Sequence, residues 1–306
     1  MVDLKLNIPE DFLKEEVRCD YLVTAEMKKE WAVLLDLLAE FDRVCKKHDI
    51  QYFASGGTYL GAIRHKGFIP WDDDIDLMMT RENYKKLLAV ADEFQHPYFL
   101  QNKYSDPCCR AMCSKLRNSD TTAYEQEEIG TKMKYNKGVF IDIFPLDCVP
   151  DDEAEKKQYL QDVWEAKQQL FSLGKKLGIY TADNRQPQKF VKETLYKLLS
   201  KRRERKVSLY KEKMRNLENV LDRYNHLKTK YLYSFSFDYV EKDLKPAEAY
   251  ETLIEVPFEF MTIPVGAGYD LALTKKYGNW HEFVKGAACH SGLFVDTDKS
   301  YLEYEK

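Results

Sequence analysis

The sequence Ile-Pro-Trp-Asp-Asp-Asp-Ile-Asp-Leu occupies residues 69–77 and places four carboxylates within five positions. Carboxylates this close repel one another unless a cation or a basic partner offsets their charge. The apolar residues on both sides predict that the run lies against the core, at the start of a buried strand. A solvated acidic turn is the alternative interpretation. The apolar flanks favour a metal site instead.

Asp74 and Asp76 are two residues apart, so alternation along the predicted strand directs both side chains to one face. Further along the chain, residues 138–147 predict a second apolar strand with Asp142 in its middle. A buried carboxylate requires a partner, and a shared metal would supply one. Carboxylate oxygens suit Mg²⁺ or Mn²⁺. We therefore predict Asp74, Asp76 and Asp142 as ligands of Mg²⁺ or Mn²⁺.

Other polar residues near these acids are candidate contacts. Asp72 and Asp73 either tune the metal from a second layer or only shape the turn. Residues 48–65 predict a strand, a glycine pair and a helix, an arrangement whose free N–H groups and helix dipole suit a phosphate. The candidate substrate-binding residues are Gly56, Gly57, Thr58, Arg64, His65 and, on a later strand, Lys115 and Arg117. An ordinary turn, a surface arginine and a solvated strand face are the corresponding alternatives.

The segment from Gly56 to Asp76 resembles the signature of the LicD family of phosphotransferases, to which the fukutin-type proteins are related. Further matches occur at residues 115–121, 138–147, 256–259 and 277–280. The resemblance spans residues 25–150 and 250–285. It implies an α+β fold with a polymerase-β-like nucleotidyltransferase core, in which helices pack on a mixed sheet, plus a helical insert.

The resemblance also implies an activity. The expected reaction transfers a phospho-alcohol, such as phosphocholine from CDP-choline, to a hydroxyl of a cell-surface glycan precursor such as teichoic acid or lipopolysaccharide. Asp74, Asp76 and Asp142 would then be catalytic, and Asp142 would also accept the proton of the acceptor. The implied partners are a CDP-alcohol donor and a glycan or lipid-linked glycan acceptor. Two alternatives stay open: a nucleotidyltransferase that moves a nucleotide from an NTP, and a non-catalytic glycan-assembly scaffold.

Hydrophobic periodicity divides the chain into three regions. Residues 1–150 predict the catalytic core, with helices at 26–47 and 81–93 and strands at 98–103, 112–118 and 139–144. Residues 151–230 are highly charged and helical in period, with a break near 183–187. This insert is the candidate acceptor-recognition region, because the matching segments flank it. Residues 231–306 are expected to pack back on the core.

Composition limits the partners and the compartment. With a net charge of −4 and a pI near 6.0, the 306-residue chain has no global attraction to nucleic acid. The N-terminus lacks a signal pattern and no apolar run approaches about 20 residues, so we expect a cytoplasmic protein. The basic run at 201–206 is either a solvated helix face or a contact with the inner membrane leaflet.

The cysteines are an odd set of seven, which favours reduced thiols over a complete disulfide framework. Cys108, Cys109 and Cys113 are close enough in sequence to suggest zinc, but their spacing matches no standard zinc motif. Free thiols and a zinc site therefore both stay open for this cluster.

Overall fold

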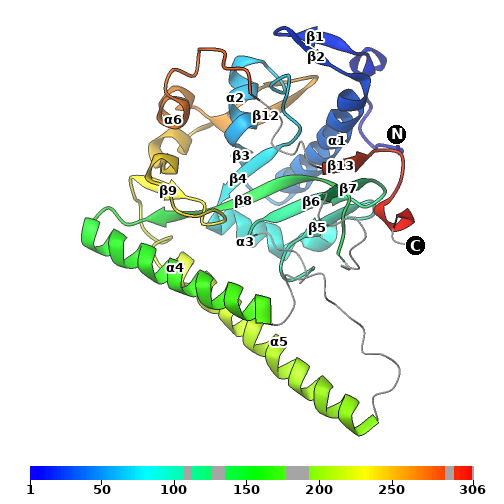
Figure 1. The fold of residues 1–306 in the computed structure, drawn as a ribbon. Coiled ribbons are helices and arrows are strands. Elements are labelled where there is room, and N and C mark those ends of the chain that lie inside the picture. Colours follow the sequence, from blue (N-terminus) through cyan, green and yellow to red (C-terminus); the bar gives the residue numbers. More distant parts are fainter. Residues whose placement is uncertain (107–111, 126–134, 177–192, 287–292, 305–306) are drawn as a thin grey trace.

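A computed structural model describes residues 1–106, 112–125, 135–176, 193–286 and 293–304 of the protein (Figure 1). These residues form an α+β fold in which helices surround a mixed sheet. The α-helices are α1 (Ala25–Lys47), α2 (Gly56–Arg64), α3 (Arg81–Ala89), α4 (Glu153–Lys176), α5 (Glu193–Asp222) and α6 (Tyr269–Tyr277). The nucleotidyltransferase-like core implied by the resemblance stays a prediction at the level of the fold.

The main sheet has seven strands. Its path runs β10-β9-β8-β4-β3, and β6 joins β8 to β5. Its strands are β3 (Phe53–Ala54), β4 (Asp76–Thr80), β5 (Tyr98–Gln101), β6 (Ser114–Asn118), β8 (Val139–Val149), β9 (Tyr231–Tyr233) and β10 (Lys245–Pro246). The strands of the small two-stranded sheets are β1 (Glu16–Arg18) with β2 (Tyr21–Val23), β11 (Leu253–Phe258) with β12 (Met261–Gly266), and β7 (Thr122–Glu125) with β13 (Leu293–Asp296).

The centre of the sheet is the long strand β8, which has different partners on its two edges. It runs parallel to β4 in a register that pairs Asp142 with Asp76. It runs antiparallel to β6 in a register that pairs Asp142 with Lys115. Residues paired across adjacent strands project from the same face. The sheet therefore brings two acids and one lysine to one row.

The longest core helix, α1, covers the opposite face of the sheet. Its hydroxyl cap is Thr24, whose Oγ1 accepts a hydrogen bond from the Met27 N–H at 3.3 Å. Its apolar stripe includes the fully buried Trp31 and Phe41, and it packs with Ile141 and Ile143 of β8 in the main core. Because these isoleucines alternate with Asp142, that acid faces away from α1.

The helices α4 and α5 pack side by side and extend from the sheet (Figure 1). Their buried residues form a second apolar cluster with β9, separate from the main core. That cluster includes Tyr159, Val163, Leu170, Tyr210, Met214, Leu217, Leu221, Tyr233 and Phe235. Among the described residues, no helix has the length and apolar character needed to cross a bilayer.

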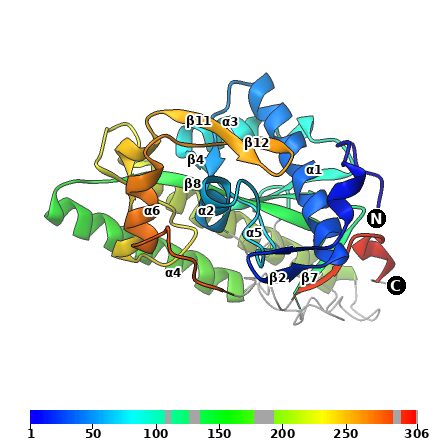
Figure 2. The ribbon, with the colours of Figure 1, turned by 90° about the horizontal axis from the view of Figure 1, so that it is seen from above.

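The C-terminal segment contacts the core through the hairpin β11–β12, which lies beside α2 (Figure 2). Strand β12 of the hairpin also contacts β3. Phe258, Ile263 and Val265 of the hairpin are fully buried in the same core as α1. Strand β13 pairs with β7 at the far side of the molecule. Two separate parts of this segment thus pack on residues that precede the helical pair.

Several predicted elements are confirmed, with changes at their ends. The helix expected at 26–47 is α1, and the helix expected at 81–93 is α3 followed by a 3₁₀ turn. The strand expected at 139–144 continues through Val149. The helix break expected near 183–187 lies outside the described residues, as do Cys108 and Cys109.

One local prediction is wrong. The strand expected from Asp74 begins at Asp76, so Asp74 lies in the preceding loop rather than on a strand face shared with Asp76. The strand begins late because the neighbouring strand β3 is short. Strand β3 ends at Ala54, which pairs with Leu77. The chain before Asp76 therefore has no β3 residue beside it and can turn.

Candidate functional site

The site is built around Asp142 in the middle of β8. Its carboxylate accepts hydrogen bonds from the Lys115 ammonium, at 2.7 Å to Oδ1 and 2.9 Å to Oδ2. The Cys113 thiol donates to Oδ1 at 3.4 Å. Asp142 is only 7% exposed, so these contacts offset part of its desolvation. Lys115 and Asp76 lie on opposite edges of β8. The pairing of Lys115 with Asp142 therefore does not separate Asp142 from Asp76.

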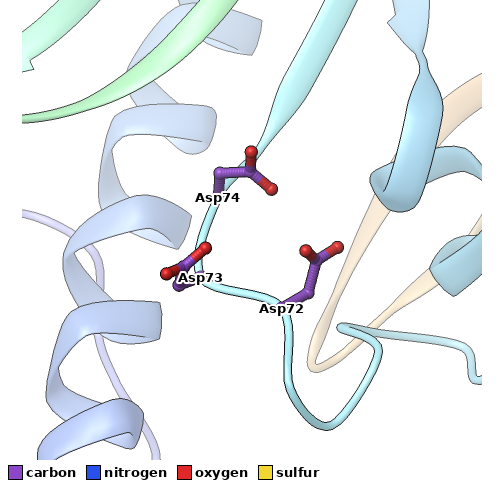
Figure 3. Close-up of side chains that lie close together, drawn as sticks. All are labelled: Asp72, Asp73 and Asp74. Carbon is purple, nitrogen blue, oxygen red and sulfur yellow. The ribbon is translucent and has the colours of Figure 1, made fainter. Parts of the chain in front are cut away.

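The acidic loop, defined as residues 72–74, supplies three more carboxylates. Asp72, Asp73 and Asp74 each have a carboxylate oxygen within 4.8 Å of the others (Figure 3). A turn shapes the loop, because the Asp72 N–H donates to the Ile69 carbonyl at 2.8 Å. The Trp31 indole N–H of α1 donates to the Asp72 carbonyl at 2.9 Å. This contact with α1 therefore fixes the backbone of the loop that carries the three carboxylates.

The electrostatics of Asp76 link the loop to the sheet. Burial raises the pKa of the Asp76 carboxyl well above its usual range, and the charges of Asp74, Asp142 and Asp72 raise it further. Lys115 opposes them, as the smallest of these influences. At the start of β4, three neighbouring carboxylates therefore act on the carboxyl of Asp76, and Lys115 is a described lysine that opposes them. Such a set of acids favours a cation as a partner.

The glycine pair lies directly against these acids. A Cβ at Gly56 would lie 2.9 Å from Asp76 Oδ2, and a Cβ at Gly57 would lie 2.4 Å from Asp72 Oδ2. Gly56 also has φ of +54°, which disfavours any side chain. The next residue, Thr58, accepts a hydrogen bond at Oγ1 from the Asp76 N–H at 2.9 Å. The start of α2 thus fits closely around two carboxylates.

Arg64 and His65 lie at the other end of α2. The Arg64 guanidinium donates to the carbonyls of Trp280 at 2.9 Å and Glu282 at 3.1 Å, and it lies 4.7 Å from the centre of the Phe283 ring. Its Nε donates to His65 Nε2 at 3.1 Å. These contacts hold the chain after α6 against α2. Phosphate binding by this pair stays a prediction, next to the structural role that the contacts give it.

Lys115 and Arg117 share one face of β6, as alternation predicts. Both lie over the ring of Phe140, at 3.6 Å and 4.5 Å from its centre. Arg117 is buried and donates to Gln101 Oε1 and the Gly138 carbonyl, both at 2.6 Å. Only Lys115 of this pair donates to Asp142. The structure therefore places Lys115 at the acids and gives Arg117 a set of buried partners.

Glu259, in the turn between β11 and β12, was not among the predicted site residues. Its carboxylate accepts two hydrogen bonds from Arg18, at 2.6 Å and 2.9 Å, and one from the Phe68 N–H at 3.0 Å. It thereby holds the chain that leads into the acidic loop. Its place in the matching segment 256–259 was the only sequence signal for it.

The donor set fits a divalent metal ion by its chemistry. The available ligands near Asp76 are carboxylate oxygens, which are the hard donors that Mg²⁺ and Mn²⁺ prefer. Three acids gather within 4.8 Å: Asp74, a predicted ligand, and Asp72 and Asp73, which were predicted either to tune the metal from a second layer or only to shape the turn. The other two predicted ligands, Asp76 and Asp142, are not in this group of described residues. Of the cysteines considered for zinc, the described one, Cys113, contacts Asp142. Zinc binding by the cluster stays a prediction.

Comparison with known proteins gives matches across this site. Residues 49–178 match the family model described as the LicD/FKTN/FKRP nucleotidyltransferase domain. The chain is 28% identical over 256 residues to the lipopolysaccharide cholinephosphotransferase LicD of Haemophilus influenzae, a match that covers 83% of this chain and 91% of that protein.

Two shorter matches are to uncharacterised proteins of Rickettsia. One from Rickettsia prowazekii is 27% identical over 118 residues, covering 37% of this chain and 44% of that protein. One from Rickettsia typhi is 32% identical over 89 residues, covering 27% of this chain and 29% of that protein. The matched family region contains the glycine pair, the acidic loop, Lys115 and Asp142. Residues 49–178 of the chain are therefore similar to the LicD/FKTN/FKRP nucleotidyltransferase domain.

Proposed function

We propose that the protein is a metal-dependent phosphotransferase that moves a phospho-alcohol, phosphocholine from CDP-choline in the first instance, to a hydroxyl of a cell-surface glycan precursor. The similarity to a lipopolysaccharide cholinephosphotransferase over most of both chains supports the substrate class. The observation that carries the proposal is the row Asp76–Asp142–Lys115, with the acidic loop beside it. The acceptor is a glycan or a lipid-linked glycan, and the reaction takes place in the cytoplasm.

The residues of the site have two kinds of role: the acids would hold the metal ion, and the other groups position the substrates. Asp72, Asp73, Asp74, Asp76 and Asp142 would hold Mg²⁺ or Mn²⁺ between them. When bound, the metal neutralises the diphosphate of the donor and helps to align the attacking and leaving oxygens. Asp142 accepts the proton of the acceptor hydroxyl as the new phosphate ester forms and CMP leaves.

Lys115 and the start of α2 complete the proposed machinery. The Lys115 ammonium donates a hydrogen bond to the Asp142 carboxylate and stabilises negative charge on the transferred phosphoryl group. The first N–H groups of α2, freed of side chains at Gly56 and Gly57, face the same region. Thr58 fixes the backbone of Asp76. Each of these groups acts by position and charge, as expected for phosphoryl transfer.

A ligand panel tests the donor class. The protein is melted with Mg²⁺ and, separately, CDP-choline, CDP-glycerol, CDP-ribitol, CTP or ATP. A donor at 100 times its Kd should stabilise the fold by about 2.7 kcal/mol. Preference for one CDP-alcohol supports the proposal. Preference for an NTP rejects it in favour of nucleotidyl transfer.

Replacement of the central acid tests the chemistry. In Asp142→Asn the amide retains the shape but cannot accept the proton, so we expect transfer to fall at least about 100-fold while the protein still folds. Transfer from CDP-[³H]choline to a glycan acceptor measures this, with Asp92→Asn, at an exposed site, as the control. Full activity of Asp142→Asn, or wild-type activity in excess EDTA, would reject the metal-dependent mechanism.

A further inference from the structure

A pocket with an excess of lysine lies beside the start of α2. Its wall includes Gly56 of α2, Lys242 of the 3₁₀ turn before β10, Lys245 of β10 and Lys276 of α6. Figure 2 shows α2 between α6 and α1. Gly56 is also the residue whose Cβ would lie 2.9 Å from Asp76 Oδ2. One residue thus separates this basic pocket from the acidic site.

Lys245 is the lysine that the pocket shields most. It is half-buried on β10, whereas Lys242 and Lys276 are exposed. Lys276 forms an ion pair with Asp243, but no hydrogen bond or ion pair of the Lys245 side chain is found among the described residues. Burial lowers the pKa of the Lys245 ammonium to about 8, as does the charge of Lys276, and Asp243 and Asp76 oppose them. A shielded ammonium of this kind favours an anion as its partner.

The remaining wall of the pocket suits the same ligand. Ser55 and Gly56 supply the N-terminal end of α2, where backbone N–H groups and the helix dipole attract negative charge. Tyr250 and Tyr277 border the pocket with aromatic rings. The positive pocket and the carboxylates therefore meet at Gly56. A phosphate in the pocket would lie next to any metal held by the acids.

We propose that this pocket is a phosphate-binding subsite and that Lys245 is its central cation. The inference rests on the proposed function for the identity of its ligand. That ligand is either the diphosphate of the donor or a phosphate group on the acceptor, and both present the same oxygens to an ammonium. The subsite assigns a binding role to the C-terminal segment, outside the matched family region 49–178.

Calorimetry with small phosphate probes tests the subsite directly. Inorganic pyrophosphate and CMP are titrated, in Mg²⁺, into the full chain and into Lys245→Met, Lys245→Gln and Lys245→Arg. Loss of the ammonium should raise Kd about tenfold or more for Met and Gln, and Arg should keep most of the affinity. The control is Lys275→Met, because Lys275 is also half-buried but lies over the Tyr231 ring at 5.1 Å and outside the pocket.

The outcomes separate the subsite from the proposed function. Binding that does not depend on Lys245 in folded Met and Gln variants, or no binding of either probe by wild type, overturns the subsite. Lys245-dependent pyrophosphate binding in a protein that transfers no CDP-alcohol upholds the subsite and rejects the proposed function. In an active enzyme, a higher KM for the donor alone identifies the donor diphosphate as the ligand, and a higher KM for the acceptor alone identifies its phosphate.

Discussion

At the scale of one residue, the buried carboxyl of Asp76 lowers the stability of the folded protein. Its raised pKa means that the folded protein binds a proton there more tightly than the unfolded chain. Stability therefore falls as pH rises above the ordinary carboxyl range, because the charged form is opposed by burial and by Asp74, Asp142 and Asp72. A divalent cation would reverse this balance, since each of those charges would then face a positive partner.

Asp76→Asn should expose this cost. In EDTA at pH 7 we expect the variant to melt about 2–4 °C above wild type, and the gap should narrow as pH falls toward 4. Mg²⁺ should then stabilise wild type more than the variant. Differential scanning fluorimetry measures both effects, with Asp92→Asn expected to match wild type. A variant less stable than wild type in EDTA at pH 7 would contradict the prediction.

His65 allows the structural role of the α2 end to be measured. Burial, together with the charges of Arg64 and Arg18, lowers the pKa of its imidazole to about 4. The depressed pKa means that stability is fully present above the ordinary value of 6.5 and is lost as pH falls from 6.5 toward 4. Because the side chain is partly exposed, we expect a loss of about 1–2 kcal/mol rather than the full amount.

His65→Gln should remove this loss. Urea unfolding at pH 7 and pH 4.5 compares the two proteins, and the exposed His226→Gln variant is expected to follow wild type. If His65 instead binds a phosphate, His65→Gln will weaken binding of the donor at pH 7. Equal acid sensitivity of wild type and His65→Gln would show that the imidazole is not the group responsible.

At the scale of elements, α2 is the part of the fold most restricted by the site. Gly56→Ala must place a methyl group at positive φ and 2.9 Å from Asp76 Oδ2. We expect a loss of stability of about 1–2 kcal/mol from the backbone, and a loss of transfer of about tenfold or more because Asp76 must move.

Gly278→Ala is the matched control for Gly56→Ala. Gly278 also has a positive φ, of +69°, but nothing lies within 4 Å of a Cβ there. The control should lose stability while transfer stays within about twofold of wild type. Urea unfolding and the transfer assay measure the two quantities. An equal loss of transfer in both variants would attribute the effect to strain in general and not to the carboxylate.

The same elements show what a sequence can predict. The helix α1 could be predicted because its apolar stripe is a local signal. Asp142 could be predicted as a site residue because an acid within an apolar strand is unusual. The shape of the acidic loop could not be predicted, because residues distant in sequence determine it. Trp31 donates a hydrogen bond to the Asp72 carbonyl, and Glu259 accepts one from the Phe68 N–H. Lys245 reaches its pocket through β10, for which no local signal exists.

At the scale of the whole molecule, Asp147 joins the helical pair to the catalytic sheet. It lies on β8, fully buried, and accepts two hydrogen bonds from Arg81 of α3, at 2.8 Å and 2.6 Å. It also accepts one from Asn225 Nδ2 at 2.8 Å, just after α5. The same strand carries Asp142 five positions earlier. A single buried carboxylate therefore connects the strand of the site, α3 and the end of α5.

Asp147→Asn tests how strongly the two apolar clusters are coupled. The amide leaves the nearly buried Arg81 guanidinium without a charged partner, so we expect a loss of about 3 kcal/mol in the free energy of unfolding. Asp162→Asn, which removes the more exposed pair with Arg223, should cost less than about 1 kcal/mol.

Urea unfolding followed by tryptophan fluorescence measures both, because Trp31 reports on the core and Trp164 lies on α4. One shared transition in wild type that splits into two in Asp147→Asn is the expected result, since the helical cluster then loses a buried polar link to the sheet. A small, unsplit change would mean that apolar packing along β8 and β9 alone couples the helices to the site.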